Sequence, residues 1–367
     1  MKNKRLQSLD ALRGFDMFFI MGGGGLFAAL AVLFPVPFFQ AIAAQMHHVA
    51  WHGLAVEDMI FPTFLFIAGI SFPYSLEKQR SSGMKSAAIY RKVIRRGLTL
   101  VLLGCIYNGM LNFNFEHLRY ASVLGRIGLA WMFAALIFLT AKTRTRIGIL
   151  AVLLIGYWLL LAFVPAPDGN GDPFSMEGCL VGYIDRLFLP GKLLCKGIHD
   201  PEGLFSTIPA IGTAMMGMFT GEWVKAKHEG ISETRKTLLL AAAGAAFLVV
   251  GLVWSLFFPI NKNLWTSSFV CVVGGISTLL FALFYYIIDV KDCRKWTLFF
   301  RVIGMNSITI YLAQRFIDFK FTNKALFTGL ASIFPESMSP LILAISYIAL
   351  CWGFLYFLYK QKIFLKV

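Results

Sequence analysis

The sequence predicts an all-α, polytopic integral membrane helical bundle with about ten transmembrane helices and both termini in the cytoplasm. First, 58% of the 367 residues are hydrophobic and only 14% are charged, whereas soluble domains average about 45–50% and about 25%. Second, apolar runs of roughly 17–25 residues, the length that spans a bilayer, recur along the chain. Third, Lys and Arg gather in short segments between these runs, as the positive-inside rule describes.

The net charge of +15 would suggest a nucleic-acid partner in a soluble protein. Here membrane topology explains the basic segments, so we expect no nucleic acid among the partners. A minority of these basic residues could instead bind an anionic cofactor at the cytoplasmic face.

The first apolar run follows a basic N-terminus that resembles the start of a signal peptide. Asp16 interrupts the run and no small-residue cleavage site follows it, so we expect a retained first helix. We expect residues 1–367 to form a single transmembrane domain. The ten predicted helices are Gly14–Phe34, Asp58–Leu76, Gly97–Asn112, Ala121–Ala141, Ile147–Val164, Phe205–Gly221, Leu238–Phe258, Thr266–Ile288, Leu298–Ile317 and Leu341–Tyr359.

The loop charges predict the orientation of these helices. If ten spans alternate, every basic connecting segment falls on one side, which the positive-inside rule assigns to the cytoplasm. The other connections then lie on the opposite side and hold most of the polar residues that could carry chemistry. These connections are Pro35–Glu57, Phe113–Tyr120, Pro165–Leu204, Pro259–Trp265 and Asp318–Pro340.

Three histidines and two carboxylates stand directly before or at the start of the second apolar run: His47, His48, His52, Glu57 and Asp58. Ionisable groups beside the membrane core are costly, so they usually serve a function. A metal site would need Glu57 or Asp58 as a further ligand, and a satisfied polar loop is another alternative. We favour one histidine as a general base, because imidazole transfers protons near neutral pH.

Asp10 and Arg13 lie one turn apart at the start of the first helix. They could bind substrate, or form only a cap and an i,i+3 ion pair at the membrane edge. Gly22–Gly25 are expected to break the regularity of the same helix near its far end. The glycines would allow either a close ligand or close helix packing.

A second set of polar residues lies in the connections opposite the cytoplasm. Asp200 and Glu202 could bind substrate or only favour the start of the following helix. Asn261, Asn263 and Trp265 combine amide donors with an aromatic platform, which suits a sugar, although a tryptophan there can also be an interfacial anchor.

Other polar residues have simpler interpretations. Cys179 and Cys195 share the longest polar loop, so a disulfide and two free thiols are both open. Asn306 and Ser307 fall inside a late span, where hydrogen bonding between helices is the default expectation.

Seven motifs occur in one order along the chain: S-L-D-A-L-R-G, H-V-A-W-H-G-L-A-V-E-D-M-I-F-P-T-F-L-F-I-A-G, L-G-R-I-G, G-Y-I-D-R, D-P-E-G-L-F-S-T-I-P, N-K-N-L-W and G-M-N-S-I. The series, from Arg5 to Phe316, resembles the transmembrane N-acetyltransferases related to heparan-α-glucosaminide N-acetyltransferase, in particular their bacterial branch.

The resemblance implies that acetyl-CoA arrives from the cytoplasm and that acetyl is delivered to a glucosamine amine on the periplasmic side of a bacterial inner membrane. The family's active-site histidine precedes a small-small-Trp sequence, which selects His48 over His47. The family is also described with an asparagine near the end of the first helix, where this chain has glycines.

A mechanism follows from these residue types. His48 could take a proton from the amino sugar or carry the acetyl group transiently. Asp58, Asp200 or Glu202 could orient the imidazole or hold the ammonium. Asn261 or Asn263 could donate to the developing oxyanion. An amino-sugar or peptidoglycan-fragment transporter is the alternative function, but no inverted repeat favours it. The expected partners are the lipid bilayer, acetyl-CoA, an amino-sugar acceptor and, as a further candidate, a second copy of the chain.

Overall fold

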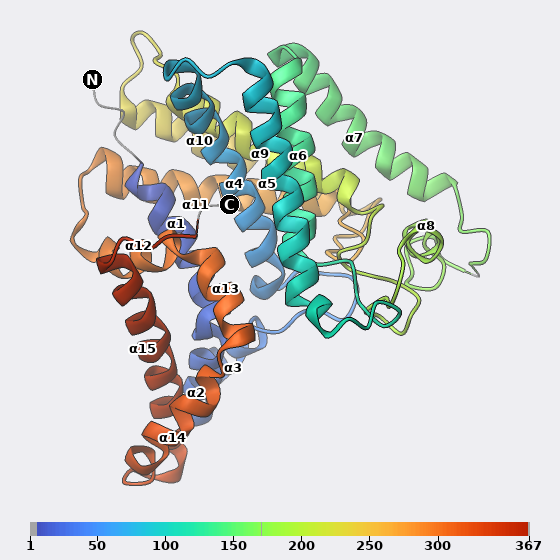
Figure 1. Cartoon of the computed structure of the whole chain (residues 1–367). Helices are drawn as coiled ribbons and strands as arrows, with labels where there is room; N and C mark the ends of the chain where they lie inside the picture. The colour runs from blue at the N-terminus through green and yellow to red at the C-terminus, as the bar shows by residue number, and fades with distance from the viewer. Residues whose placement is uncertain (1–5, 170, 366–367) are drawn as a thin grey trace. The chain divides into compact units, whose positions relative to one another are not determined.

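The structure, a computed structural model, describes residues 6–169 and 171–365, which divide into two compact units. Among these residues, the first unit contains 6–49, 55–60 and 283–365, and the second contains 50–54, 61–169 and 171–282. The described residues form helices and turns with two isolated bridges and no strand (Figure 1). The all-α prediction is therefore confirmed, whereas a single domain over residues 1–367 stays a prediction.

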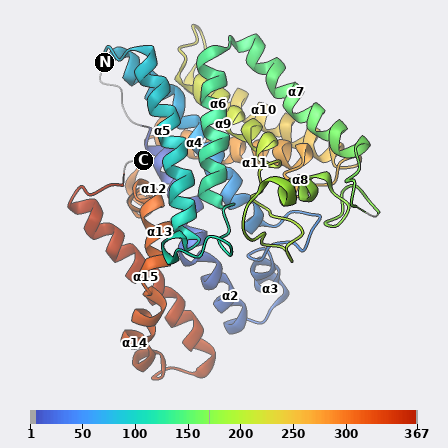
Figure 2. The same cartoon turned by 45° about the vertical axis from the view of Figure 1, so that its right-hand side comes forward.

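The first unit combines both ends of the chain. Helices α2 and α3 lie side by side, as do α14 and α15 (Figures 1 and 2). Besides the first turn of α4 and the end of α11, its elements are α1 (Gln7–Phe18), η1 (Phe19–Gly23), α2 (Gly24–Leu33), α3 (Pro37–Ala44), η3 (Tyr286–Val290), η4 (Lys295–Thr297), α12 (Leu298–Met305), α13 (Ser307–Phe316), α14 (Phe319–Ala331), η5 (Glu336–Met338) and α15 (Ser339–Lys360).

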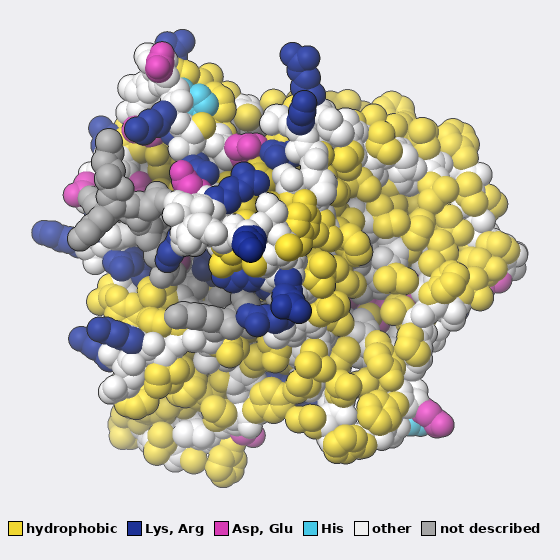
Figure 3. All heavy atoms as spheres, turned by 45° about the horizontal axis from the view of Figure 1, so that its top comes forward, with side chains coloured by type: hydrophobic (Ala, Val, Ile, Leu, Met, Phe, Trp, Pro, Cys, Tyr) yellow, Lys and Arg dark blue, Asp and Glu magenta, His cyan; other side chains and the backbone are white. Residues whose placement is uncertain are grey.

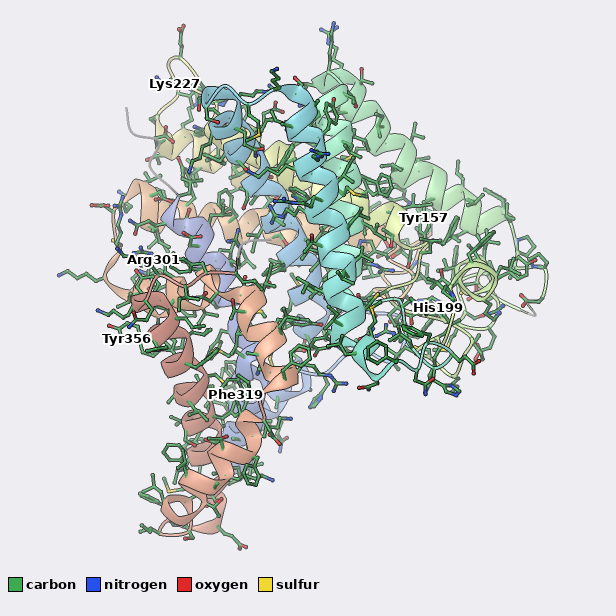
Figure 4. All side chains as sticks on the ribbon, viewed as in Figure 1. Tyr157, His199, Lys227, Arg301, Phe319 and Tyr356 are labelled. Atoms are coloured by element: carbon green, nitrogen blue, oxygen red, sulfur yellow. The ribbon has the colours of Figure 1, made fainter. Side chains whose placement is uncertain are left out.

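The second unit contains the middle of the chain, in which α6 packs between α5 and α9. Its elements are α4 (Val56–Ser81), α5 (Ser86–Tyr107), η2 (Met110–Asn112), α6 (Val123–Thr140), α7 (Thr143–Phe163), α8 (Leu180–Phe188), α9 (Thr207–Lys225), α10 (Glu233–Trp254) and α11 (Ser267–Tyr285). Lys227, in the basic connection before α10, lies at the opposite end of this unit from His199 (Figure 4). Basic connections and polar loops thus occupy opposite ends of the unit, as alternating spans require.

Seven stretches of the described helices are long and apolar enough to cross a membrane, and α12 and α13 pass the same test together although they are bent by 57°. These eight correspond to eight of the ten predicted spans. The seven are Gln7–Leu33, Val56–Ser81, Val123–Thr140, Thr143–Phe163, Glu233–Trp254, Ser267–Val290 and Glu336–Lys360. The chain is an integral membrane protein, while the total of ten and the cytoplasmic termini stay predictions.

The two remaining predicted spans are helices of another kind. The first half of α5 carries four basic residues, Arg91, Lys92, Arg95 and Arg96. Helix α9 is less apolar because most of its side chains are buried against other helices rather than exposed to lipid. Buried membrane helices need small residues for close approach more than they need apolar ones.

Glycines bring α9 into backbone contact with α4. A Cβ atom added at Gly217 would lie 2.1 Å from the carbonyl oxygen of Phe66, and one at Gly221 would lie 2.4 Å from that of Ile70. Gly69 has the same restriction, because its Cβ would lie 2.3 Å from the carbonyl oxygen of Ala214. The pair Gly217 and Gly221 is a small-xxx-small motif that sets the distance between the helices.

We expect Gly217→Ala to destabilise the protein by about 1–3 kcal/mol, because the added methyl group must push the two backbones apart. Gly156→Ala on α7 is the matched control, since a Cβ atom there meets nothing within 4 Å. The midpoint of thermal unfolding in detergent measures both variants. Equal midpoints for the two would contradict the contact between α4 and α9.

Two glycine positions shape the first span. A Cβ atom at Gly14 would lie 1.7 Å from the carbonyl oxygen of Phe300, and one at Gly304 would lie 2.0 Å from that of Asp10, so α1 and α12 cross in backbone contact. Gly22 has φ 145° within η1, a π-helical turn that interrupts the span. The predicted break near Gly22–Gly25 is confirmed, and the positive φ favours glycine there.

Candidate active site

His48 and Asp58 form a hydrogen-bonded pair in the first unit, which we call the dyad. The Nδ1 atom of His48 lies 2.8 Å from Oδ1 of Asp58. The carboxylate can only accept, so Nδ1 carries the hydrogen and the lone pair is on Nε2. The imidazole side chain is 57% exposed, whereas that of Asp58 is 2% exposed. An accessible basic nitrogen held by a buried carboxylate is the arrangement that a general base needs.

Asp58 is held by the backbone around it. Its Oδ2 atom accepts hydrogen bonds from the amides of Val49, at 3.3 Å, and Ala55, at 3.1 Å. Asp58 is the third residue of α4 and reaches back to the residue before the helix, as the acidic member of a capping box does. The helix start thereby fixes the carboxylate that orients His48.

Gln45 ties the loop that carries His48 to the same helix start. Its carbonyl oxygen accepts from the amide of Glu57 at 3.1 Å, and its side-chain Oε1 accepts from the amide of Val56 at 3.2 Å. These bonds satisfy donors of the first turn of α4 that have no partner within the helix. Residues 45 and 55–58 thus close the loop at both ends.

The following residues, 50–54, are anchored in the second unit. The indole nitrogen of Trp51 donates to the carbonyl oxygen of Phe174 at 2.7 Å, and the amide of Gly53 donates to that of Ile260 at 2.8 Å. His52 Nδ1 lies 3.3 Å from Nδ2 of Asn261. Because an amide nitrogen donates, Nδ1 of His52 is the acceptor.

Asn261 organises the connection before α11. The side chain is fully buried, and its Oδ1 accepts from the amide of Leu264 at 2.9 Å. Its own amide donates to the hydroxyl of Thr266 at 3.1 Å. Of the predicted amide donors, Asn261 presents its side-chain nitrogen to His52, whereas Asn263 uses its backbone carbonyl oxygen to accept a hydrogen bond from His199.

His199 is a buried histidine that joins three loops (Figure 4). Its Nε2 donates to the carbonyl oxygen of Asn263 at 3.1 Å, its Nδ1 lies 3.9 Å from Sγ of Cys179, and its ring meets Trp51 edge-on with centroids 5.3 Å apart. Burial lowers the pKa of His199 to about 4, and burial likewise raises the pKa of Cys179 to about 11. Both are neutral near pH 7. Cys179 and Cys195 are free thiols in the structure.

Asp200 and Glu202 are both bound by Arg119. The guanidinium donates to Oδ2 of Asp200 at 2.8 Å through Nε and to Oδ1 at 2.6 Å through Nη2, and it also contacts Oε2 of Glu202. Asp200 is fully buried and further accepts from the amides of Leu194 and Glu202. Burial lowers the pKa of Arg119, but the hydrogen bonds and negative charges of Asp200 and Glu202 together outweigh it, so the net pKa is raised and Arg119 stays charged. The structure thus places both carboxylates in an ion-pair cluster.

Trp265 is 0% exposed, and its ring covers the buried guanidinium of Arg126. Its indole donates to the hydroxyl of Thr213 at 3.2 Å, and Cζ of Arg126 lies 4.8 Å from its ring centroid. Arg126 donates through Nη2 to the carbonyl oxygen of Gly203 at 3.0 Å and to the hydroxyl of Ser206. Its Nε and Nη1 have no partner among the described residues. The enclosed ring of Trp265 thus contacts Arg126 rather than solvent.

Asp185 supports the turn before α9. Its Oδ1 accepts from the amides of Leu204 at 2.8 Å and Phe205 at 3.3 Å. Burial raises the pKa of Asp185 to about 6, against the opposing effect of these amides and of Arg126. The motifs L-G-R-I-G and G-Y-I-D-R contain Arg126 and Asp185, and charges next to or within apolar helices are the signal by which sequence could have identified them.

We expect Asp185→Asn to remove a pH-dependent part of the stability. The folded state binds this proton more tightly than the unfolded state, so the carboxyl's contribution falls as pH rises from about 4 to about 6 and stays lower above. The midpoint of thermal unfolding is measured for both proteins between pH 4.5 and 7.5. Near pH 7 the variant should unfold at a higher temperature than the wild type, and the difference should shrink towards pH 4.5. A constant difference across that range would contradict the raised pKa.

Asp10 and Arg13 lie away from the dyad. They form an i,i+3 pair at 3.7 Å near the start of α1. A Cβ atom on Gly24 would be 3.7 Å from Met46 in the loop that carries His48, and fourteen residues of helix separate Asp10 from Gly24, or roughly 20 Å. The structure therefore does not bring this pair to the dyad.

The remaining sequence expectations concern metal and Asn306. Within residues 6–169 and 171–365, no three His, Cys, Asp or Glu side chains form a group that could hold a metal ion. Asn306 is 2% exposed at the bend between α12 and α13, and neither side-chain atom of its amide has a hydrogen-bond partner among the described residues. The default expectation of a hydrogen bond between helices is wrong for Asn306.

Comparisons with known proteins agree on one family. The catalytic-domain profile of heparan-alpha-glucosaminide N-acetyltransferase matches residues 5–256. The heparan-alpha-glucosaminide N-acetyltransferases of Homo sapiens and Mus musculus are 28% and 27% identical to this chain over alignments that cover 99% of it. The chain spans 60% of the length of each of these relatives.

Proposed function

The chain belongs to the family of heparan-α-glucosaminide N-acetyltransferase catalytic domains, and on this premise we propose that it is an acetyl-CoA-dependent amino-sugar N-acetyltransferase. It moves acetyl from cytoplasmic acetyl-CoA to the amine of a glucosamine-type sugar on the periplasmic side of a bacterial inner membrane. The observation that carries the proposal is the dyad, in which a buried carboxylate leaves the exposed Nε2 of His48 as an acceptor of protons.

The proposed reaction begins with the sugar ammonium, which cannot attack a thioester. Nε2 of His48 takes one proton from it, and the freed nitrogen lone pair attacks the thioester carbonyl carbon. The new C–N bond forms, the C–S bond breaks, and the CoA thiolate leaves with the electron pair of that bond. The imidazolium releases this first proton to solvent. Nε2 then takes the second proton from the attacking nitrogen and passes it to the thiolate, so the products are a neutral amide and a neutral thiol, and His48 ends neutral. Asp58 stabilises the charged imidazolium meanwhile.

Transfer through acetyl-histidine is the alternative route for the same residues. Nε2 would then attack the thioester, release CoA and hold the acetyl group until the amine arrives. The same tautomer serves both routes, because each needs the lone pair on Nε2. Trapping an acetylated protein in the absence of acceptor distinguishes them.

The loop residues of the second unit are proposed to serve the acceptor sugar. Asn261 presents an amide nitrogen beside His52, and its second N–H suits a carbonyl or oxyanion, with Asn263 as its neighbour. Asp200 and Glu202 are proposed to attract the ammonium of the sugar through their negative charge, part of which Arg119 balances. For Trp265 we propose an indirect role through Arg126, because its ring is enclosed.

Asp10 and Arg13 are proposed to act on the donor side. They lie at the start of α1, which the loop charges assign to the cytoplasmic end. Arg13 could there attract the phosphates of acetyl-CoA, while Asp10 holds Arg13 in place. The lipid bilayer surrounds the protein, and a homodimer stays a candidate assembly.

Purified protein in detergent, supplied with acetyl-CoA and glucosamine, tests the proposed activity. We expect release of CoA thiol in step with formation of N-acetylglucosamine. Mannitol, which lacks an amine, is the control acceptor and should release no thiol above background. Absence of turnover, together with counterflow of glucosamine in proteoliposomes, would instead support the transporter.

A further inference from the structure

Helix α5 carries a groove on the face that points away from the rest of the second unit. The groove has a volume of about 790 Å³ and is lined by Arg91, Ile94, Arg95, Leu98, Thr99 and Leu102. The opposite face of α5 packs on α6 through glycines: a Cβ atom at Gly97 would lie 2.7 Å from Met132, and one at Gly104 would lie 2.0 Å from Ser122. The groove therefore lies on the face of α5 opposite its contact with α6.

Charge and apolar surface are separated along the groove. The two arginines are exposed and stand one turn apart towards the start of α5. Ile94, Leu98 and Leu102 are 41%, 54% and 49% exposed and continue the same stripe towards the end of the helix. Residues spaced by four share one face of a helix. The order from cation to apolar chain matches the order from headgroup to acyl chain in a phospholipid.

Arg91 and Arg95 differ from the arginines near them that have partners in the protein. Arg96, the next residue, stacks over Trp131 at 4.3 Å, and Arg146 of α7 pairs with Glu222 at 3.2 Å. Within the described part of the chain, no acidic side chain forms an ion pair with Arg91 or Arg95. Arg95 lies about 14 Å along α5 from Ser86, between exposed apolar residues, where a charge without a counter-ion is costly.

We propose that this groove binds an anionic phospholipid, with Arg91 and Arg95 on the phosphate and the stripe of Ile94, Leu98 and Leu102 against an acyl chain. The lipid supplies the counter-charge that the protein does not provide. Anionic headgroups attract basic residues at the membrane surface, and Lys and Arg gather on the face that Figure 3 shows (dark blue). The apolar lining favours a lipid over the polar nucleotide of CoA.

Native mass spectrometry of the delipidated full chain tests the proposal. Dioleoylphosphatidylglycerol is compared with dioleoylphosphatidylcholine, which has the same acyl chains and no net charge. We expect the wild type to bind the anionic lipid at least tenfold more tightly. Arg91→Gln/Arg95→Gln should lose this preference, because two cations near the surface account for it.

Lys142→Gln/Arg144→Gln is the matched control, since both residues are exposed and lie before or within the first turn of α7 outside the groove. It should keep the wild-type preference. The anionic lipid should also raise the unfolding midpoint of the wild type and the control, but not of the groove variant. Equal loss in both variants, an unchanged preference in the groove variant, or displacement of the lipid by coenzyme A would overturn the proposal.

Discussion

His48→Ala is expected to reduce the rate of acetyl transfer to glucosamine by about 10²–10⁴-fold, the contribution typical of a positioned general base. The loss has a direct physical cause. In the dyad, Nε2 of His48 carries the lone pair, and alanine provides no other acceptor for the proton of the ammonium. The measurement is kcat for thiol release at saturating acetyl-CoA and glucosamine.

His47→Ala is the matched control for that variant. The two histidines are adjacent and both exposed, but the dyad contact with Asp58 belongs to His48. We expect the His47 variant to keep wild-type kcat within about twofold, as substitutions outside a catalytic contact usually do. Equal losses at the two positions, or full activity of His48→Ala, would refute the assignment of the base.

Asp58→Asn is expected to lower kcat by about 10²–10³-fold without a comparable change in KM for the sugar. Asparagine can present its NH₂ group to Nδ1 of His48, which would then accept a hydrogen bond and leave the hydrogen on Nε2. That tautomer cannot take a proton from the substrate. Steady-state kinetics with varied glucosamine separate kcat from KM.

Two further variants separate orientation of the imidazole from simple loss of structure. Glu57→Gln changes the neighbouring carboxylate in the same helical turn and should leave kcat near the wild-type value. Asp58→Ala removes both the orienting group and the acceptor for the Ala55 amide, so it should also lower the unfolding midpoint, in line with a lost helix cap of about 1 kcal/mol. An Asp58→Asn protein with wild-type kcat would show that the carboxylate does not position His48.

Local patterns predicted much of the helical structure. Apolar runs identified the positions of all the long helices, because the cost of exposing backbone in lipid leaves few alternatives to a helix. Helices α5 and α9 are less uniformly apolar than the others, and their assignment as spans stays a prediction. Most side chains of α9 are buried, so its composition reflects close packing at Gly217 and Gly221. The average hydrophobicity of a segment does not measure such packing.

The candidate site was predictable only where its parts are near in sequence. His48 and Asp58 are ten residues apart, and one helix start and one short loop bring them together. The partner of Asp200 is Arg119, which is eighty-one residues away and belongs to a different loop. No periodic pattern in the local sequence can predict a pair between residues so far apart. The burial of Trp265 was missed for the same reason. A tryptophan at the membrane interface and a buried tryptophan stacked on Arg126 have the same local sequence pattern.

Asp58 also links the stability of the start of α4 to the orientation of the proposed catalytic base. The same carboxylate closes the first turn of α4 and fixes the imidazole of His48. A selection for heat-resistant variants at this position therefore also acts on catalysis, because a substitution that removes the carboxylate alters both contacts. Improvement that leaves catalysis unchanged is expected elsewhere in the chain, and a homologue with a different residue here would need another way to begin the helix and another way to hold its base.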